Sequence, residues 1–143
     1  YVSTPDFINL SLWENAVYVL DNMLYYFVRQ YDCNQGFLTS LNLDTGEWSK
    51  PFLIRDTQSR SDFIYYRDKL LLVHAPIDRE GFGIVEVDTE DLSRSRPIAV
   101  AKMKDSLFYP FVDVYGDDAY ISYTIARKHI RLTKFHLPDY LEK

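Results

Sequence analysis

Three arginines recur at a nearly constant spacing along this sequence, and their type is well suited to binding an anion. Arg29, Arg79 and Arg127 are separated by 50 and 48 residues, and each follows an apolar run. A guanidinium is planar and always charged, and it binds a carboxylate through two parallel hydrogen bonds. Residues that repeat with the period of a structure share one of its faces. Two interpretations therefore stand: a shared anion site, or separate surface residues that pair with nearby acids.

Further candidates stand in front of two other apolar runs. The polar segment 58–62 contains Arg60 and Asp62, and Tyr109 holds the matching place before a later run. Some glycosidases use a tyrosine nucleophile, which an acidic residue can assist. Tyr109 and Asp62 are thus the candidate catalytic residues and Arg60 a candidate ligand-binding residue. The alternatives are a core aromatic for Tyr109 and a strand cap for Asp62. His74 is predicted to act as an acid or to hydrogen-bond a sugar hydroxyl, and the alternative is a satisfied histidine at a strand end.

The elements that must position these residues follow an internal repeat. Three segments each contain an apolar run, a tight polar turn and a second apolar run, which predicts a β-hairpin. The turn residues are of types that tolerate a positive φ. A period of 46 to 49 residues is typical of a four-stranded propeller blade. The segments are 15–29, 61–79 and 110–127, with turns at Asp21-Asn22, Arg67-Asp68 and Gly116-Asp117.

Each hairpin is followed by a third apolar run, and the first two by a fourth that begins with proline. The chain is therefore predicted to be all-β, a single propeller segment (1–143) of three four-stranded antiparallel blades, the last without its fourth strand. Closed propellers have four to eight blades. Two explanations are then possible. The chain is a fragment of a longer, six-bladed-type propeller, or two copies of it form a homodimer that completes the ring. The predicted blades are about 15–55, 61–103 and 109–137, with an extra strand at 6–13.

Composition argues against several classes of protein. A net charge of −5 and a pI near 5.1 disfavour a surface that binds nucleic acid. No apolar run approaches the roughly 20 residues that a membrane-spanning helix needs. The single cysteine, Cys33, has no His or Cys at metal-ligand spacing, and no cofactor motif occurs. We therefore expect no metal, no cofactor, no nucleic acid and no membrane among its partners.

The segment from Tyr109 to Arg131 resembles a late blade of the sialidase-like (BNR/Asp-box) propellers. A Tyr-Pro pair opens its first strand, and the hairpin Ala119-Tyr-Ile-Ser-Tyr-Thr-Ile-Ala-Arg127 is similar to that family's pattern. The Asp-box, Ser-x-Asp-x-Gly-x-x-Trp, is matched in part by Asn42-Leu-Asp44-Thr-Gly46-Glu-Trp48. That stretch has Asn for the first Ser and one residue fewer before Trp, and residues 88–92 lack both Gly and Trp.

Sialidases are six-bladed glycoside hydrolases that bind the substrate carboxylate with three arginines and attack with a tyrosine. The resemblance implies that Arg79 and Arg127 bind the carboxylate, with Arg29 and Arg60 next. It implies a carbohydrate-active protein, extracellular or periplasmic, that binds or hydrolyses a glycan or acidic sugar through an Arg-lined central site. The alternative is a non-catalytic propeller module for ligand or protein binding.

Overall fold

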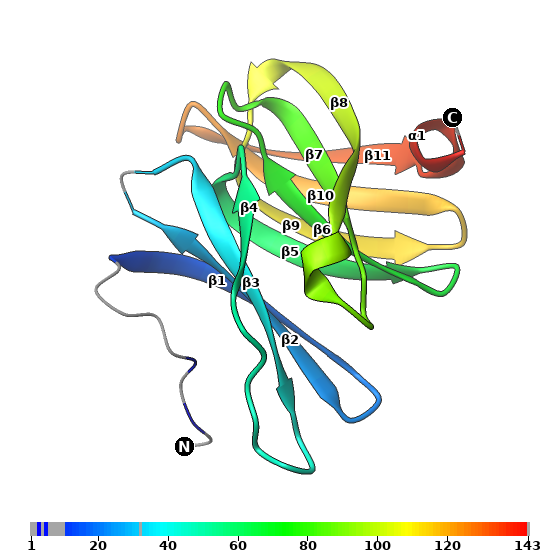
Figure 1. Ribbon diagram of the computed structural model, residues 1–143. Helices are drawn as coiled ribbons and strands as arrows, with labels where there is room; N and C mark the ends of the chain where they lie inside the picture. The colour runs from blue at the N-terminus through cyan, green and yellow to red at the C-terminus, as the bar shows by residue number, and fades with distance from the viewer. Residues whose placement is uncertain (1–2, 4, 6–10, 32, 143) are drawn as a thin grey trace.

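The computed structural model describes residues 3, 5, 11–31 and 33–142, which form three antiparallel sheets (Figure 1). We call these sheets blades 1, 2 and 3. Blade 1 contains β1 (Leu12–Leu20), β2 (Met23–Gln30), β3 (Gln35–Asn42) and β4 (Phe52–Arg55). Blade 2 contains β5 (Gln58–Tyr66), β6 (Lys69–Ala75), β7 (Glu80–Val87) and β8 (Arg96–Ser106). Blade 3 contains β9 (Phe108–Tyr115), β10 (Asp118–Ile125) and β11 (His129–His136).

Helical structure is confined to two short elements in the described part of the chain. These are the 3-10 turn η1 (Leu92–Arg94) and the helix α1 (Pro138–Leu141). Neither is long and apolar enough to span a bilayer. The prediction of an all-β chain with three hairpin-based sheets is therefore confirmed.

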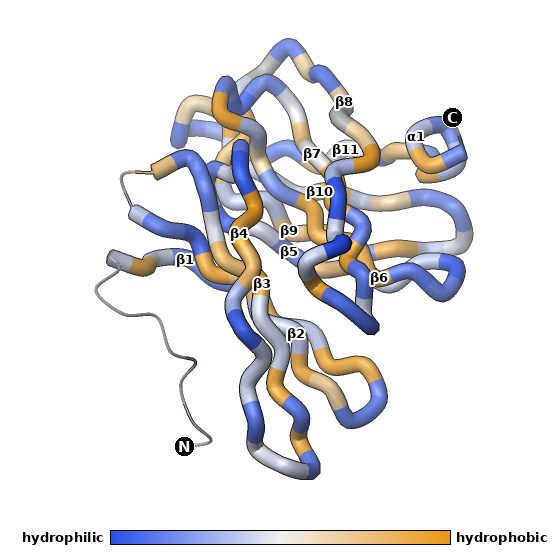
Figure 2. The backbone as a smooth tube through the Cα atoms, viewed as in Figure 1, coloured by the Kyte–Doolittle hydropathy of each residue, from blue (hydrophilic) through white to orange (hydrophobic). Residues whose placement is uncertain are grey.

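The three predicted hairpin turns are confirmed, because each joins the first two strands of its blade. Asp21, Arg67, Asp68 and Gly116 have φ values of 54°, 45°, 61° and 60°. These left-handed conformations match the right-handed twist of the flanking strands. Most hydrophobic residues lie within the strands, and hydrophilic residues are frequent at the hairpin turns, as Figure 2 shows.

The first strand of each blade lies beside the first strand of the next. β5 contacts β1 on one side and β9 on the other, so these three are the innermost strands. One apolar core fills the space between blades 1 and 2, around Phe27, Leu38 and Leu72. A second core lies between blades 2 and 3, around Phe82 and Ile121. Stacking of the sheets therefore places equivalent ends of the blades at one end of the molecule.

Each innermost strand begins earlier than the apolar pattern predicted. The pairing register shifts near the beginning of all three, between Leu12 and Asn15, between Gln58 and Asp62, and opposite Ser122–Thr124 in β9. Bulges of this kind let a strand continue past an irregular step and re-aim its side chains. Of the extra strand predicted at 6–13, residues 6–10 lie outside the described residues, and residues 12 and 13 belong to β1.

Both outer blades present an apolar face that no other blade covers in the described structure. On blade 1, Val17 and Val19 are 54% and 53% exposed. On blade 3, Ile130 and Leu132 are 80% and 67% exposed. Three blades thus stack in an open row, with apolar surface at each end of the row.

Candidate functional site

Two of the three repeating arginines meet at one side chain. Arg29, near the end of β2, donates a hydrogen bond from Nη2 to Oε1 of Gln58 at 3.2 Å. Arg79, just before β7, donates from Nη2 to the same oxygen at 2.9 Å. Gln58 is the first residue of β5, so blade 2's innermost strand joins an arginine of blade 1 to an arginine of its own blade.

The third arginine reaches the same place through an aromatic ring. The guanidinium carbon of Arg79 lies 4.4 Å from the ring centre of Phe108, and that of Arg127 lies 5.6 Å from it. A cation over an aromatic face is attracted by the ring's quadrupole. The structure therefore brings Arg29, Arg79 and Arg127 together from three blades. We call these arginines, with Glu14, Gln58 and Phe108, the arginine cluster.

The cluster holds more positive than negative charge. Among its residues Glu14 is the one carboxylate. It forms an ion pair with Arg29, whose Nη1 donates a hydrogen bond to Oε2 of Glu14 at 2.9 Å. Both side chains are largely buried, at 12% exposed for Arg29 and 22% for Glu14. Burial lowers the pKa of Arg79, and the charges of Arg29 and Arg127 lower it further. Like charges held together in a partly desolvated place attract an anion.

Two donors of the cluster have no acceptor among the described residues. They are Nε of Arg29 and Nη1 of Arg79, both shielded from solvent. A buried donor without a partner costs about 1 to 3 kcal/mol, and more when it is charged. The cluster is therefore not a set of fully paired structural arginines.

The backbone around the cluster is strained. Arg79 and Arg127 both have a φ of 57°, in equivalent turns between the second and third strands of their blades. Ser59 and Tyr109, at the beginnings of β5 and β9, have φ values of 58° and 52°. Non-glycine residues in this region cost of order 1 kcal/mol each, and such residues gather at functional sites.

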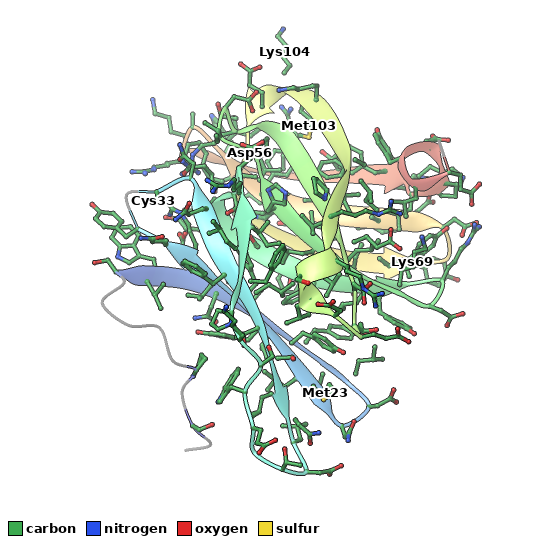
Figure 3. All side chains as sticks on the ribbon, viewed as in Figure 1. Met23, Cys33, Asp56, Lys69, Met103 and Lys104 are labelled. Carbon is green, nitrogen blue, oxygen red and sulfur yellow. The ribbon has the colours of Figure 1, made fainter. Side chains whose placement is uncertain are left out.

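The cluster lies at the end of the blades opposite the hairpin turns of the first two strands. Figure 3 labels Cys33 and Asp56 toward this end, and Met23, beside a hairpin turn, at the far end. Cys33 lies in the β2–β3 turn and Asp56 just before β5, so turns and strand beginnings surround the cluster.

Asp62 has a structural partner that the sequence did not reveal. Its two carboxylate oxygens accept from the backbone N–H groups of Phe63 and Val112, at 3.0 and 2.9 Å. Val112 belongs to β9, so Asp62 links the innermost strands of blades 2 and 3. Burial raises the pKa of Asp62, although both N–H bonds and the charge of Arg60 lower it. Among the described residues this carboxylate makes no hydrogen bond to the Tyr109 hydroxyl, and the roles of Tyr109 and Asp62 as nucleophile and base stay predictions.

Tyr109 and Arg60 lie at the same end of the molecule as the cluster. Tyr109 is 51% exposed, follows Phe108 directly and anchors its backbone N–H to Oγ of Ser59 at 2.9 Å. Tyr109 is also close enough to affect the pKa of Arg79. Arg60 is exposed on β5 and acts electrostatically on Asp62. Both remain candidates for contact with a ligand.

His74 does not join the cluster. It is 5% exposed, and its ring packs so closely on Gly83 that a Cβ there would lie 2.5 Å from it. Its neighbours Val73 and Ala75 pack in the core shared with blade 3. Because side chains alternate along a strand, His74 points the other way, to a cavity of about 270 Å³ beside β4. The alternative predicted for it, a satisfied histidine at a strand end, describes this position, because its Nδ1 lies 3.1 Å from the carbonyl oxygen of Ala75 at the end of β6.

We predict that His74 makes stability fall as the solution becomes acidic. Burial lowers its pKa below the ordinary 6.5. The unfolded chain then takes up a proton near pH 6.5 while the folded chain does not, so stability present above that pH is lost below it. For this one group, the free energy of unfolding changes by at most about 1.4 kcal/mol per pH unit. Urea denaturation between pH 7.5 and 5 should give a flatter profile for His74→Gln. His129→Gln, at an exposed position, is the matched control variant, and an unchanged slope in His74→Gln would contradict the assignment.

The described residues offer no metal-ligand group. No set of three or more His, Cys, Asp or Glu side chains among them is arranged to hold a metal ion.

Sequence comparisons find neither a family model nor a curated protein that matches this chain. Solved structures do match. GH43B of a Bacteroides ovatus xyloglucan PUL has a TM-score of 0.60 at 16% identity, over 89% of this chain and 27% of that one. The exo-β-1,3-galactanase of Phanerochaete chrysosporium has a TM-score of 0.66 at 9% identity, over 86% and 32%. A bifunctional GH43-CE protein of Bacteroides eggerthii has a TM-score of 0.63 at 10% identity, over 87% and 18%.

The chain folds as a segment of a β-propeller. Its structural neighbours are GH43 glycoside hydrolases, which are five-bladed propellers, and their low sequence identity establishes the fold alone. The sialidase resemblance is therefore supported only as far as the β-propeller fold, and its six blades are not carried over. The chain spans between 18% and 32% of these proteins.

Sequence reasoning missed three members of the cluster. Glu14, Gln58 and Phe108 were given no role, although each stands near the beginning of an innermost strand. Their common position in the repeat was the available signal. Their chemical types differ, so a search for repeated residue types could not find them.

Proposed function

We propose that this chain is part of a carbohydrate-active propeller that binds an acidic sugar of a glycan at the arginine cluster. The observation that carries the proposal is the meeting of Arg29, Arg79 and Arg127 around Gln58 and Phe108, with Glu14 as their one carboxylate. A sugar carboxylate matches the guanidinium fork and offsets the excess charge. The glycoside hydrolases among the structural neighbours support a carbohydrate ligand.

Aromatic side chains beside the cluster suit a sugar ring. Trp13 stacks on Tyr31 with ring centres 4.0 Å apart, and Arg29 lies 5.9 Å from the Trp13 ring. Trp13 is 53% exposed and Tyr31 38% exposed. An exposed aromatic face packs against the apolar face of a sugar, while a nearby cation holds its acid group.

The structural role of Asp62 favours the second candidate function, a non-catalytic binding module. Each of its oxygens accepts a backbone hydrogen bond, and together these bonds tie the carboxylate to the innermost strands of blades 2 and 3. A sialidase-like glycoside hydrolase with Tyr109 as nucleophile would need a base that reaches the Tyr109 hydroxyl, from this chain or from further blades. Either function is proposed to act on extracellular or periplasmic glycans.

The proposal is tested by calorimetric titration with glucuronate and galacturonate and with the neutral sugars glucose and galactose. The wild-type chain is expected to bind at least one acid and neither neutral sugar. Arg79→Ala should weaken acid binding by about tenfold or more, because an ionic hydrogen bond contributes about 1.5 to 3 kcal/mol. Arg127→Ala, at an exposed turn, should weaken it with little effect on folding.

Arg96→Ala is the matched control, since Arg96 is 72% exposed on β8 and pairs with Glu86 away from the cluster. It should bind as the wild type does. Equal affinity for acidic and neutral sugars, or unchanged binding in both cluster variants, would rule out the proposed role of the arginines.

A further inference from the structure

Gln58 occupies an unusual electrostatic position. One amide oxygen accepts from two guanidiniums, those of Arg29 and Arg79, which come from neighbouring blades. The like charges of these two arginines act on each other, since Arg29 lowers the pKa of Arg79. A carboxylate at this place would be the ordinary way to hold two arginines together. The chain has an uncharged amide there instead.

The orientation of the Gln58 amide is fixed from its other side. Its Nε2 donates to Oδ1 of Asn34, in the β2–β3 turn of blade 1. The backbone carbonyl of Asn34 also accepts from the N–H of Thr57, at 3.3 Å. With Nε2 engaged by Asn34, Oε1 faces the arginines. Gln58 is therefore a fixed acceptor that spaces two cations without neutralising them.

The neutral amide has a consequence for what the cluster can bind. Glu14 is paired with Arg29 through Nη1, and neither Arg79 nor Arg127 has a carboxylate partner among the described residues. A glutamate at position 58 would differ from glutamine by little in shape and would bring a second negative charge between the arginines. The formal charge of the three arginines and their carboxylates would then fall from +2 to +1, and an anion would gain less by entering the cluster.

We propose that Gln58 is the residue that reserves this site for an anionic sugar. It acts as a positioning residue, holding Arg29 and Arg79 at a fixed separation while leaving their charge for a hexuronate carboxylate. The inference rests on the proposed function, because it names the residue on which the selectivity of that site depends. The neutral amide at position 58 makes the folded chain less stable than a carboxylate would, and it leaves the positive charge of Arg29 and Arg79 available to an anionic ligand.

Gln58→Glu separates the two effects in one variant. The added carboxylate should pair with both arginines and raise the melting temperature by a few degrees in low-salt buffer, while Asn34 can present its NH₂ by an amide flip. Glucuronate and galacturonate should bind at least about tenfold more weakly than to the wild type, because the anion meets a like charge. Gln58→Met is the size-matched control: it removes the acceptor without adding charge and should lower the melting temperature.

The outcomes are distinct. A more stable Gln58→Glu variant that binds the acids weakly supports the inference. Wild-type affinity in Gln58→Glu, or a lower melting temperature than wild type, overturns it and leaves the arginine result intact. If the wild-type chain binds neither acid, the proposed function fails and the inference falls with it.

Discussion

Ile84→Ala is expected to lower the free energy of unfolding by about 3 kcal/mol, while Leu132→Ala changes it by less than about 0.5 kcal/mol. The two residues hold the same place in successive blades. Ile84 of β7 is paired with Val73 of β6, and Leu132 of β11 is paired with Ser122 of β10. Val73 and Ser122 are each the fifth residue after the hairpin turn of their blade. Yet Ile84 is 0% exposed, in the core shared with blade 3, and Leu132 is 67% exposed.

Urea denaturation of the two variants and the wild type measures this difference directly. Each variant is the control for the other, because side-chain volume and strand position are nearly matched. A cost at Leu132 as large as that at Ile84 would contradict the open face of blade 3. It would mean that another surface, a second copy's or a further blade's, covers Leu132 in solution. Light scattering on the same samples separates a dimer from a monomer.

Gly81→Ala is expected to destabilise the chain by roughly 3 kcal/mol or more, against about 1 kcal/mol for Gly46→Ala. Gly81 has a φ of 116° in β7, opposite Lys102 of β8. A Cβ there would lie 1.8 Å from the carbonyl oxygen of Ala101, which is backbone and cannot move aside. Gly46 has a φ of 75° in an exposed turn, and a Cβ there would meet no atom within 4 Å.

The comparison isolates the clash. An alanine at either position would have to adopt a left-handed conformation, and only an alanine at position 81 would also collide with a neighbouring strand. Thermal and urea denaturation of both variants measure it. Similar losses in the two variants would show that backbone conformation alone accounts for the effect. The β7–β8 pairing would then tolerate displacement near Lys102.

Repetition in the sequence was sufficient to predict the blades. The turns at Asp21-Asn22, Arg67-Asp68 and Gly116-Asp117 depend on local backbone preference, and the apolar alternation of the flanking strands depends on one buried face. Both are properties of neighbouring residues, so they can be recognised without the fold. The period of Arg29, Arg79 and Arg127 likewise predicted that they would share an end of the blades.

Tertiary structure decided what these residues contact. Gln58 gained a role because stacking of blades 1 and 2 brings Arg29 to the beginning of β5, a contact between positions 29 residues apart. Asp62 was predicted to be either a catalytic residue or a strand cap, and the same stacking sets its carboxylate against the backbone of Val112. His74 had two predicted roles, and the alternation of side chains along β6 decides that its ring lines a cavity beside blade 1, away from the arginine cluster.

The amino-acid sequence by itself thus determined the strands, the turns and the repeat, because these follow from local preference and periodicity. Which face of a strand meets a neighbour, and which polar groups share an acceptor, depends on how the sheets stack and where the innermost strands bulge. Those bulges lie near the beginnings of β1, β5 and β9. The arginine cluster lies at that end of the blades, so its composition could be known only from the packed blades.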